Sequence, residues 1–227
     1  LVDGSQPTGA SLNLIDVNAP DVSYDGQRIV FAGIAAGQPP NAWRIYSIDA
    51  DGSDLRQVTI TDLDYGQLDM SQFGDVNFGP YGDFDPVWLP DGRIVFSSTR
   101  WPSYGQYSGV RTSNLYVVHA SGAGMRRITS ERNGAERPLI DPITGKIVYA
   151  RWWRNHRSPV DSMATILEPA GGYIQHLGLT TNPADTSGRP AHMTRNSWQL
   201  ATINPDGAAL ALWGGRYRDL DISHAYR

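Results

Sequence analysis

Short apolar runs separated by turn signals set the pattern of this chain. The clearest is Ile94-Val95-Phe96, inside WLPDGRIVFSSTR at residues 88–100. An unbroken apolar run that follows Pro90-Asp91-Gly92 predicts a strand buried on both faces after a tight turn. The proline presets φ, and Gly92 supplies the positive φ that lets the chain reverse. The pattern therefore predicts β-hairpins.

The same phrase recurs along the chain, at residues 23–33, 89–99 and 141–151. A second shared phrase follows each copy, and its hairpin turns are predicted at Asp51-Gly52, Ser121-Gly122 and Asp206-Gly207. Each unit thus holds two hairpins, or four short antiparallel strands. Repeated units of this kind are typical of the blades of an all-β β-propeller. A β-sandwich, the structural alternative, gives no reason for two phrases to recur in the same order.

The predicted propeller spans residues 1–227, with blades at about 18–59, 83–129 and 134–213 and a partial one at 1–17. The third unit contains an insertion at 152–196, which we expect on a rim of the propeller. Closed propellers carry about 4 to 8 blades, so the three to four expected here fall short of a ring. We expect the rest of a longer chain, or a partner subunit, to complete the propeller. The first residue is Leu1 and not Met, which favours an excerpt of a longer protein.

Composition and charge limit the kinds of binding partner that we expect. The 24 glycines and 15 prolines are scattered between the apolar runs, which agrees with frequent turns. The net charge is −4, from 19 basic and 23 acidic residues that are interspersed, so nucleic acid and membrane surfaces are not expected partners. No apolar stretch approaches the roughly 20 residues that cross a bilayer. The chain has no cysteine, which excludes disulfides and C-x-x-C-H haem attachment within it.

Several segments resemble a known repeat family. They are SYDGQRIVF, IYSIDADGSDLRQVT, DFDPVWLPDGRIVFSSTR and LYVVHASGAGMRRIT, which resemble the TolB-like, WD-repeat-like propeller repeats of bacterial envelope proteins. The order PDVSYDGQRIVF, LRQVT, DFDPVWLPDG, KIVYARW and INPDG is also similar to the large planctomycete-type proteins that include the hydrazine synthase alpha subunit. The resemblance implies a six- or seven-bladed ring and a periplasmic or extracellular location. Because cysteine is absent, haem enters only if other domains or subunits supply it.

One acidic loop is a candidate metal site. Carboxylates at alternate positions are how short loops assemble oxygen ligands for Ca²⁺, and the candidate ligands are Asp62, Asp64 and Asp69. The loop is no EF-hand, because Phe73 stands where the bidentate glutamate belongs. Asp83 and Asp85 contribute only if the connection folds back. The alternative is a solvated acidic loop between blades.

RWWRNHR, at residues 151–157, is the densest cluster of aromatic and guanidinium groups. Stacked tryptophan and arginine planes hold sugars, bases or anions, so the candidate ligand-binding residues are Arg151, Trp152, Trp153, Arg154 and His156. Because the cluster leaves a strand and enters the insertion, we expect it near a rim or the channel mouth. The alternative is that the two tryptophans form a local core under the insertion.

No catalytic residue is assigned, because the chain contains no H-E-x-x-H, no G-x-S-x-G elbow and no P-loop. The first functional hypothesis is a non-catalytic scaffold or binding module of an extracytoplasmic bacterial protein, acting in protein–protein or ligand interaction. The second is the propeller portion of a larger enzyme, either a hydrazine synthase-like redox subunit or a propeller-associated hydrolase or lyase. The third is a carbohydrate-binding module that uses Trp152, Trp153 and the aromatic loop at Trp101–Tyr107.

Overall fold

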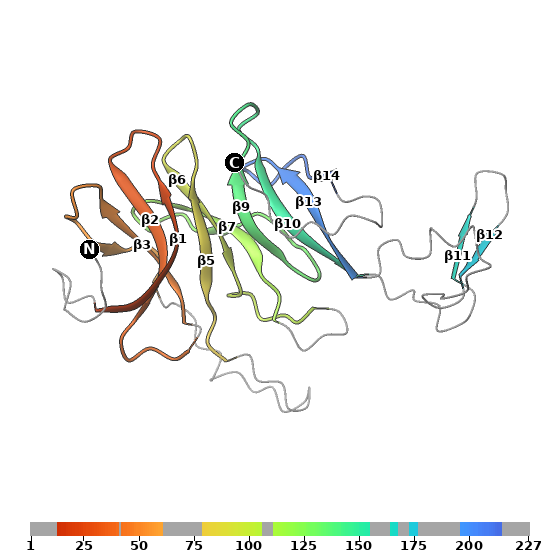
Figure 1. Ribbon diagram of the computed structural model, residues 1–227, viewed down its shortest axis with the longest axis horizontal. Helices are drawn as coiled ribbons and strands as arrows, with labels where there is room; N and C mark the ends of the chain where they lie inside the picture. Colours follow the sequence, from red (N-terminus) through yellow and green to blue (C-terminus); the bar gives the residue numbers. More distant parts are fainter. Residues whose placement is uncertain are drawn as a thin grey trace.

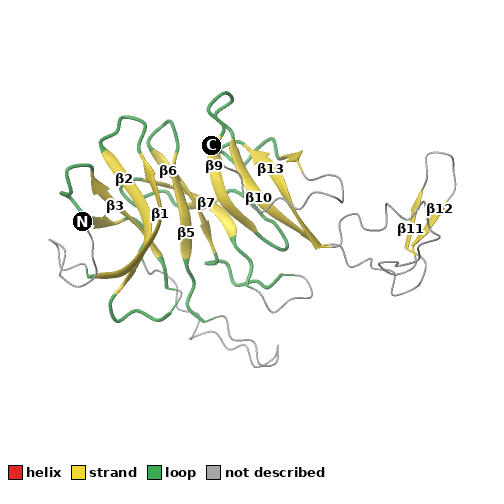
Figure 2. Ribbon diagram, in the orientation of Figure 1, coloured by secondary structure: helices red, strands yellow, loops and turns green. Residues whose placement is uncertain are grey.

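The fold is all-β in the part of the chain that the structure describes. The computed structural model describes residues 13–40, 42–60, 79–105, 111–154, 164–167, 173–176 and 196–214. These residues form strands, turns and loops, with no helix among them (Figure 2). Accordingly, nothing in these ranges is a helix long and apolar enough to span a bilayer. Three four-stranded antiparallel sheets stand side by side in chain order, which confirms the predicted blades of a β-propeller (Figure 1).

The blades are built alike. The first contains β1 (Leu14–Val22), β2 (Arg28–Ala35), β3 (Arg44–Asp49) and β4 (Arg56–Gln57). The second contains β5 (Asp83–Trp88), β6 (Arg93–Ser98), β7 (Asn114–His119) and β8 (Arg126–Arg127). The third contains β9 (Ala135–Ile140), β10 (Ile147–Arg154), β13 (Asn196–Ile203) and β14 (Ala211–Gly214). Between β10 and β13 in the sequence, β11 (Ala164–Leu167) pairs with β12 (Tyr173–His176).

The turns have the backbone that their sequences predict. Gly92, between β5 and β6, has a φ of +81°, and Gly52, Gly122 and Gly207 lie between +86° and +91°. Asp91 accepts hydrogen bonds from the Arg93 side chain, which lower the pKa of the Asp91 carboxyl. Only glycine adopts such φ values without strain, so these residues fix where each hairpin reverses.

The middle blade supplies the core on both of its faces. Ile94, Val95 and Phe96 of β6 are fully buried, as their apolar run predicts. Side chains alternate across a strand, so Ile94 and Phe96 join a cluster with the first blade and Val95 joins a cluster with the third. The three blades are therefore held together by two interblade apolar layers.

The blades converge along their first strands. β1 packs against β5, and β5 packs against β9, whereas the last strands β4 and β8 make no interblade strand contact of this kind within the described residues. Sheets that meet at one edge and spread at the other are arranged as propeller blades around an axis. The strands β1, β5 and β9 therefore face the axis.

Each axial strand carries the same irregularity. A β-bulge adds one residue opposite the second strand of the blade, between Asn18 and Asp21, between Phe84 and Val87, and beside Glu136 in the third blade. The bulged residues have left-handed backbone: Ala19 (φ 49°), Asp85 (φ 49°) and Arg137 (φ 54°). A proline follows each of them, at positions 20, 86 and 138. Proline is tolerated in strands at edges and bulges, so the motif both ends regular pairing and re-aims one side chain per blade.

Candidate functional site

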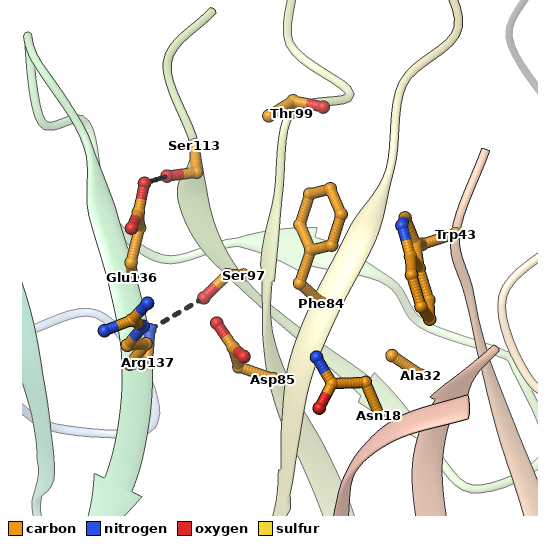
Figure 3. Close-up of a pocket in the computed structure, with 10 residues that line it drawn as sticks. All are labelled: Asn18, Ala32, Trp43, Phe84, Asp85, Ser97, Thr99, Ser113, Glu136 and Arg137. Atoms are coloured by element: carbon orange, nitrogen blue, oxygen red, sulfur yellow. Dashed lines mark hydrogen bonds between the residues drawn. The ribbon is translucent and has the colours of Figure 1, made fainter. Parts of the chain in front are cut away.

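A pocket of about 270 Å³ lies where the bulged strands converge (Figure 3). We call it the axial pocket, and its lining residues are Asn18, Ala32, Trp43, Phe84, Asp85, Ser97, Thr99, Ser113, Glu136 and Arg137. All three blades contribute to this lining. The pocket is therefore a product of blade convergence and not of one loop.

Most of the lining comes from positions that are equivalent in the repeat. The strand registers align Asn18 with Phe84 and Glu136, the residues just before each bulged residue. They also align Ala32 with Ser97, and Trp43 with Ser113. At the bulge itself, Asp85 and Arg137 line the pocket.

The residues that shape each blade repeat more strictly than the residues that line the axial pocket. The Gly at each turn, the Ile-Val-aromatic run and the proline after each bulge recur from blade to blade. At the position before the bulge, the lining changes from asparagine to phenylalanine to glutamate. At the bulge, the aspartate of the second blade and the arginine of the third line the pocket, whereas the alanine of the first blade is not a lining residue. The blade architecture does not demand these changes, because the same architecture forms with each residue. The axial pocket is accordingly the part of the fold where side-chain chemistry is set independently of packing.

Charged groups of both signs line the pocket on the side of the second and third blades. The backbone N–H of Arg137 donates to Ser97 Oγ (3.0 Å), which fixes the bulge of β9 against β6. Ser113 Oγ donates to Glu136 Oε1 (3.0 Å). The Arg137 side chain is exposed, and no hydrogen bond or ion pair joins its guanidinium to any of the described residues. It is an exposed cation in a pocket that two carboxylates, those of Asp85 and Glu136, also line.

Aromatic rings line the rest of the pocket. Figure 3 shows the Phe84 and Trp43 rings apart from the charged groups, with Asn18 below them and Asp85 nearer Ser97. Both rings are only partly buried, so each keeps surface that a ligand can contact. A cavity with apolar walls and a few polar groups of both signs suits a small organic ligand or an inserted side chain.

The ion pair next to this site is structural. Arg100 Nη2 lies 2.9 Å from Asp83 Oδ2, Ser98 Oγ donates to Asp83 Oδ1 (2.6 Å), and both charged side chains are almost completely buried. The Arg100 guanidinium also lies 5.0 Å from the centroid of the Tyr81 ring. Asp83 is therefore held by Arg100 and Ser98, and its contribution to a metal site with the acidic loop stays a prediction.

The predicted ligand cluster begins at the end of β10. Arg151 Nε lies 2.7 Å from Glu131 Oε2, and Tyr149 Oη donates to Glu131 Oε1 (2.9 Å). Burial, followed by the nearby Glu131 charge, raises the pKa of Tyr149 well above its ordinary value, so this phenol stays protonated as a donor. Arg151 is thus held in a network with the third blade, and its role toward a ligand stays a prediction.

The tryptophans of that cluster lie in the same strand. Trp152 stacks on Trp198 of β13 with 5.8 Å between ring centroids. Trp153 and Arg154 pair with Ser197 and Asn196 in the β10–β13 ladder. His156 lies outside the described residues, as do the candidate calcium ligands Asp62, Asp64 and Asp69.

The aromatic loop proposed for carbohydrate begins at Trp101, which is 55% exposed. The Arg127 guanidinium lies 4.8 Å from the centroid of its ring. One face of this ring therefore interacts with the outer strand β8. Binding of a sugar to this loop stays a prediction.

Sequence reasoning missed the axial pocket. It treated Asp85 only as an accessory to the acidic loop and gave no role to Arg137. The available signal was a residue followed by proline, at a similar distance before the turn glycine in each unit: Ala19-Pro20, Asp85-Pro86 and Arg137-Pro138. Proline at an equivalent strand position in every repeat indicates a bulge on an edge strand, and that edge is the one that faces the axis.

Comparison with known proteins supports the β-propeller fold and nothing beyond it. No protein-family model and no curated protein matches the chain. Among solved structures, the chain is similar to the hydrazine synthase of Kuenenia stuttgartiensis, with 16% identity over 86% of this chain and 24% of that chain, at a TM-score of 0.52. A TolB from Acinetobacter baumannii aligns over 93% of this chain and 34% of that chain, with 14% identity and a TM-score of 0.47. The chain thus spans about a third or less of these structures, which are β-propeller proteins at low identity.

Proposed function

We propose that the chain is a non-catalytic β-propeller binding module of an extracytoplasmic bacterial protein, with the axial pocket as its binding site. One observation carries the proposal: the frame of the blade repeats, while the residues that line the axial pocket change from blade to blade. The extracytoplasmic setting rests on the resemblance of the repeats to those of envelope proteins. Cell fractionation of the source bacterium with an antibody against the chain tests that setting.

The pocket chemistry indicates which ligands to test. The exposed guanidinium of Arg137 favours an anionic group, because arginine presents a fork of donors to a carboxylate. The Asp85 and Glu136 carboxylates favour a cation or a donor. Trp43 and Phe84 offer apolar ring surface. Benzoate and benzylamine each combine a ring with one of these charges, and they are suitable probes.

The experiment is ligand-observed NMR with both probes on the folded chain. We expect Arg137→Gln to remove the saturation-transfer signal of benzoate and Asp85→Asn to weaken that of benzylamine. Arg132→Gln is the matched control, because Arg132 is an exposed arginine that does not line the pocket. It is expected to leave both signals unchanged.

Two results would contradict the proposal. One is equal binding of both probes to every variant, which would place the binding site elsewhere. The other is turnover of a bound compound that Arg137→Gln abolishes, which would make the pocket catalytic. Circular dichroism and thermal unfolding of each variant establish that the fold is intact.

A further inference from the structure

The outer ends of the first and second blades are each covered by the blade that follows. Val58 after β4 and Ile128 after β8 are only 3% and 8% exposed. Val58 packs in a cluster with the second blade, and Ile128 packs in a cluster with the third. The equivalent residue of the third blade is Trp213, which is 57% exposed. The third blade therefore carries one half of an interblade contact with no described blade against it.

The same face continues across the sheet. In the first blade its members Ile45 and Ser47 are completely buried, and in the second blade Leu115 and Val117 are. Their equivalents in the third blade, by the β10–β13 register, are Leu200 and Thr202, which keep part of their surface exposed. We call Leu200, Thr202 and Trp213 the tail face.

The first blade carries the other half of the contact. The second blade packs onto the first through residues that include Trp88, Ile94 and Val118, which are at most 3% exposed. By register, their equivalents in the first blade are Val22, Ile29 and Ile48. Val22 is 54% exposed, and the two isoleucines are partly exposed. We call Val22, Ile29 and Ile48 the head face.

The turn glycines also show that the second and third blades each have a preceding blade against them, whereas no described blade precedes the first. A Cβ on Gly122 would lie 2.7 Å from the carbonyl oxygen of Val58, and one on Gly207 would lie 3.2 Å from that of Ile128. In both cases the turn of one blade sits against the outer end of the preceding blade. At Gly52 of the first blade, a Cβ would meet nothing within 4 Å. The space in front of Gly52 is where a preceding blade would place its outer carbonyl.

We propose that two copies of this chain associate head to tail, with the tail face of each copy packed on the head face of the other. The two faces are complementary because they are the two halves of an interface that forms twice within one chain. A head-to-tail interface gives a closed ring when its rotation closes. Two copies of three blades make a six-bladed ring, which lies within the usual range of about 4 to 8 blades, and both apolar faces are then covered.

The test uses the absence of cysteine from the chain. Arg126 of the second blade donates to the carbonyl oxygens of Pro205 and Asp206 in the third (3.1 Å each). The equivalent positions at the proposed interface are Ala211 and Asp51. When Ala211→Cys and Asp51→Cys chains are mixed, we expect a short bismaleimide to give covalent dimers. Neither chain alone is expected to give them.

An interface that already exists within the chain provides a calibration pair, which serves as the positive control for cross-linking. The double variant Arg126→Cys/Asp206→Cys carries the same pair of positions at an occupied interface, and it is expected to cross-link within one chain. Sedimentation equilibrium on the cysteine-free chain is expected to show a dimer. Trp213→Glu is expected to weaken this dimer at least about tenfold, because it places a charge in an apolar contact. Ile143→Glu, at a 91% exposed residue outside both faces, is the matched control and should keep the dimer.

Other results overturn the proposal. A chain that stays monomeric at every concentration, with its calibration pair cross-linked, would exclude a second copy as the partner of the tail face. A dimer that Trp213→Glu does not weaken, or that the mixed cysteine chains do not cross-link while the calibration pair does, would use a different surface.

Discussion

At the scale of single residues, the Asp83–Arg100 pair is costly to break, because both charged side chains are almost completely buried. Arg100 Nη2 contacts both carboxylate oxygens of Asp83, at 3.2 and 2.9 Å, and the side chains are 0% and 5% exposed. A carboxylate taken out of water depends on such partners, because losing one leaves a buried charge without compensation. The pair therefore fixes the start of β5 against the end of β6, next to the axial pocket.

We expect Arg100→Met to destabilise the chain by about 3–5 kcal/mol, the usual cost of breaking a buried pair from one side. Adding Asp83→Leu should recover much of that loss, because apolar pairs often replace buried ion pairs at little cost. Urea unfolding of the wild type, the single variant and the double variant measures both effects. If Arg100→Met unfolds at the wild-type midpoint, the pair contributes little.

At the scale of the hairpin, two turn glycines with similar backbone have different neighbours. Gly92 has a φ of +81° and Gly122 a φ of +86°. A Cβ on Gly92 would meet nothing within 4 Å, whereas one on Gly122 would lie 2.7 Å from Val58 O. Both positions carry the conformational cost of an L-residue at positive φ, but only Gly122 adds a clash with a backbone atom of another blade.

Gly92→Ala is therefore expected to cost about 1–2 kcal/mol, the usual cost of left-handed backbone for a non-glycine residue. Gly122→Ala should cost at least about 1 kcal/mol more, because the carbonyl at Val58 must move. Chemical unfolding of the two variants side by side measures the difference. Equal losses would mean that the interblade contact yields freely, and binding lost without any loss of stability in Gly92→Ala would contradict a purely architectural turn.

These two glycines also show which features of the fold can be predicted from the sequence and which cannot. The turn pattern around Pro90 predicts a positive φ at Gly92, because that requirement is local. It does not predict the Val58 carbonyl in front of Gly122, because that neighbour comes from another blade. The axial pocket follows the same rule: the x-Pro bulges are visible in the sequence, but the meeting of Asp85 with Arg137 depends on how the sheets converge. The repeated sequence phrases thus predict the strands and turns of each blade, but the residues that meet in the axial pocket depend on how the blades pack together.

At the scale of the whole molecule, stability is unevenly distributed across the three blades. The middle blade has an apolar layer on each face, and the outer blades each share only one of these layers. In repeat architectures, stability is close to a sum of the units and their nearest-neighbour interfaces. The middle blade is therefore the part whose opening requires both layers to break.

We expect native-state hydrogen exchange to show this order. Amides of β6 and β7 should exchange only through global unfolding, while amides of β1 and β14 should exchange through openings of lower free energy. Measurements over a series of denaturant concentrations distinguish these routes. A single free energy of opening for all strands would contradict the additive description and would make the three blades one cooperative unit.

The burial of Val58 and Ile128 under the next blade also has a consequence for synthesis on the ribosome. When a blade emerges, the apolar residue after its last short strand is exposed to solvent. It becomes buried only after the following blade has been translated. Domains tend to fold as they emerge, from the N-terminus onward. The growing chain would thus always expose the apolar residue that follows the last strand of its newest blade, until the next blade covers it.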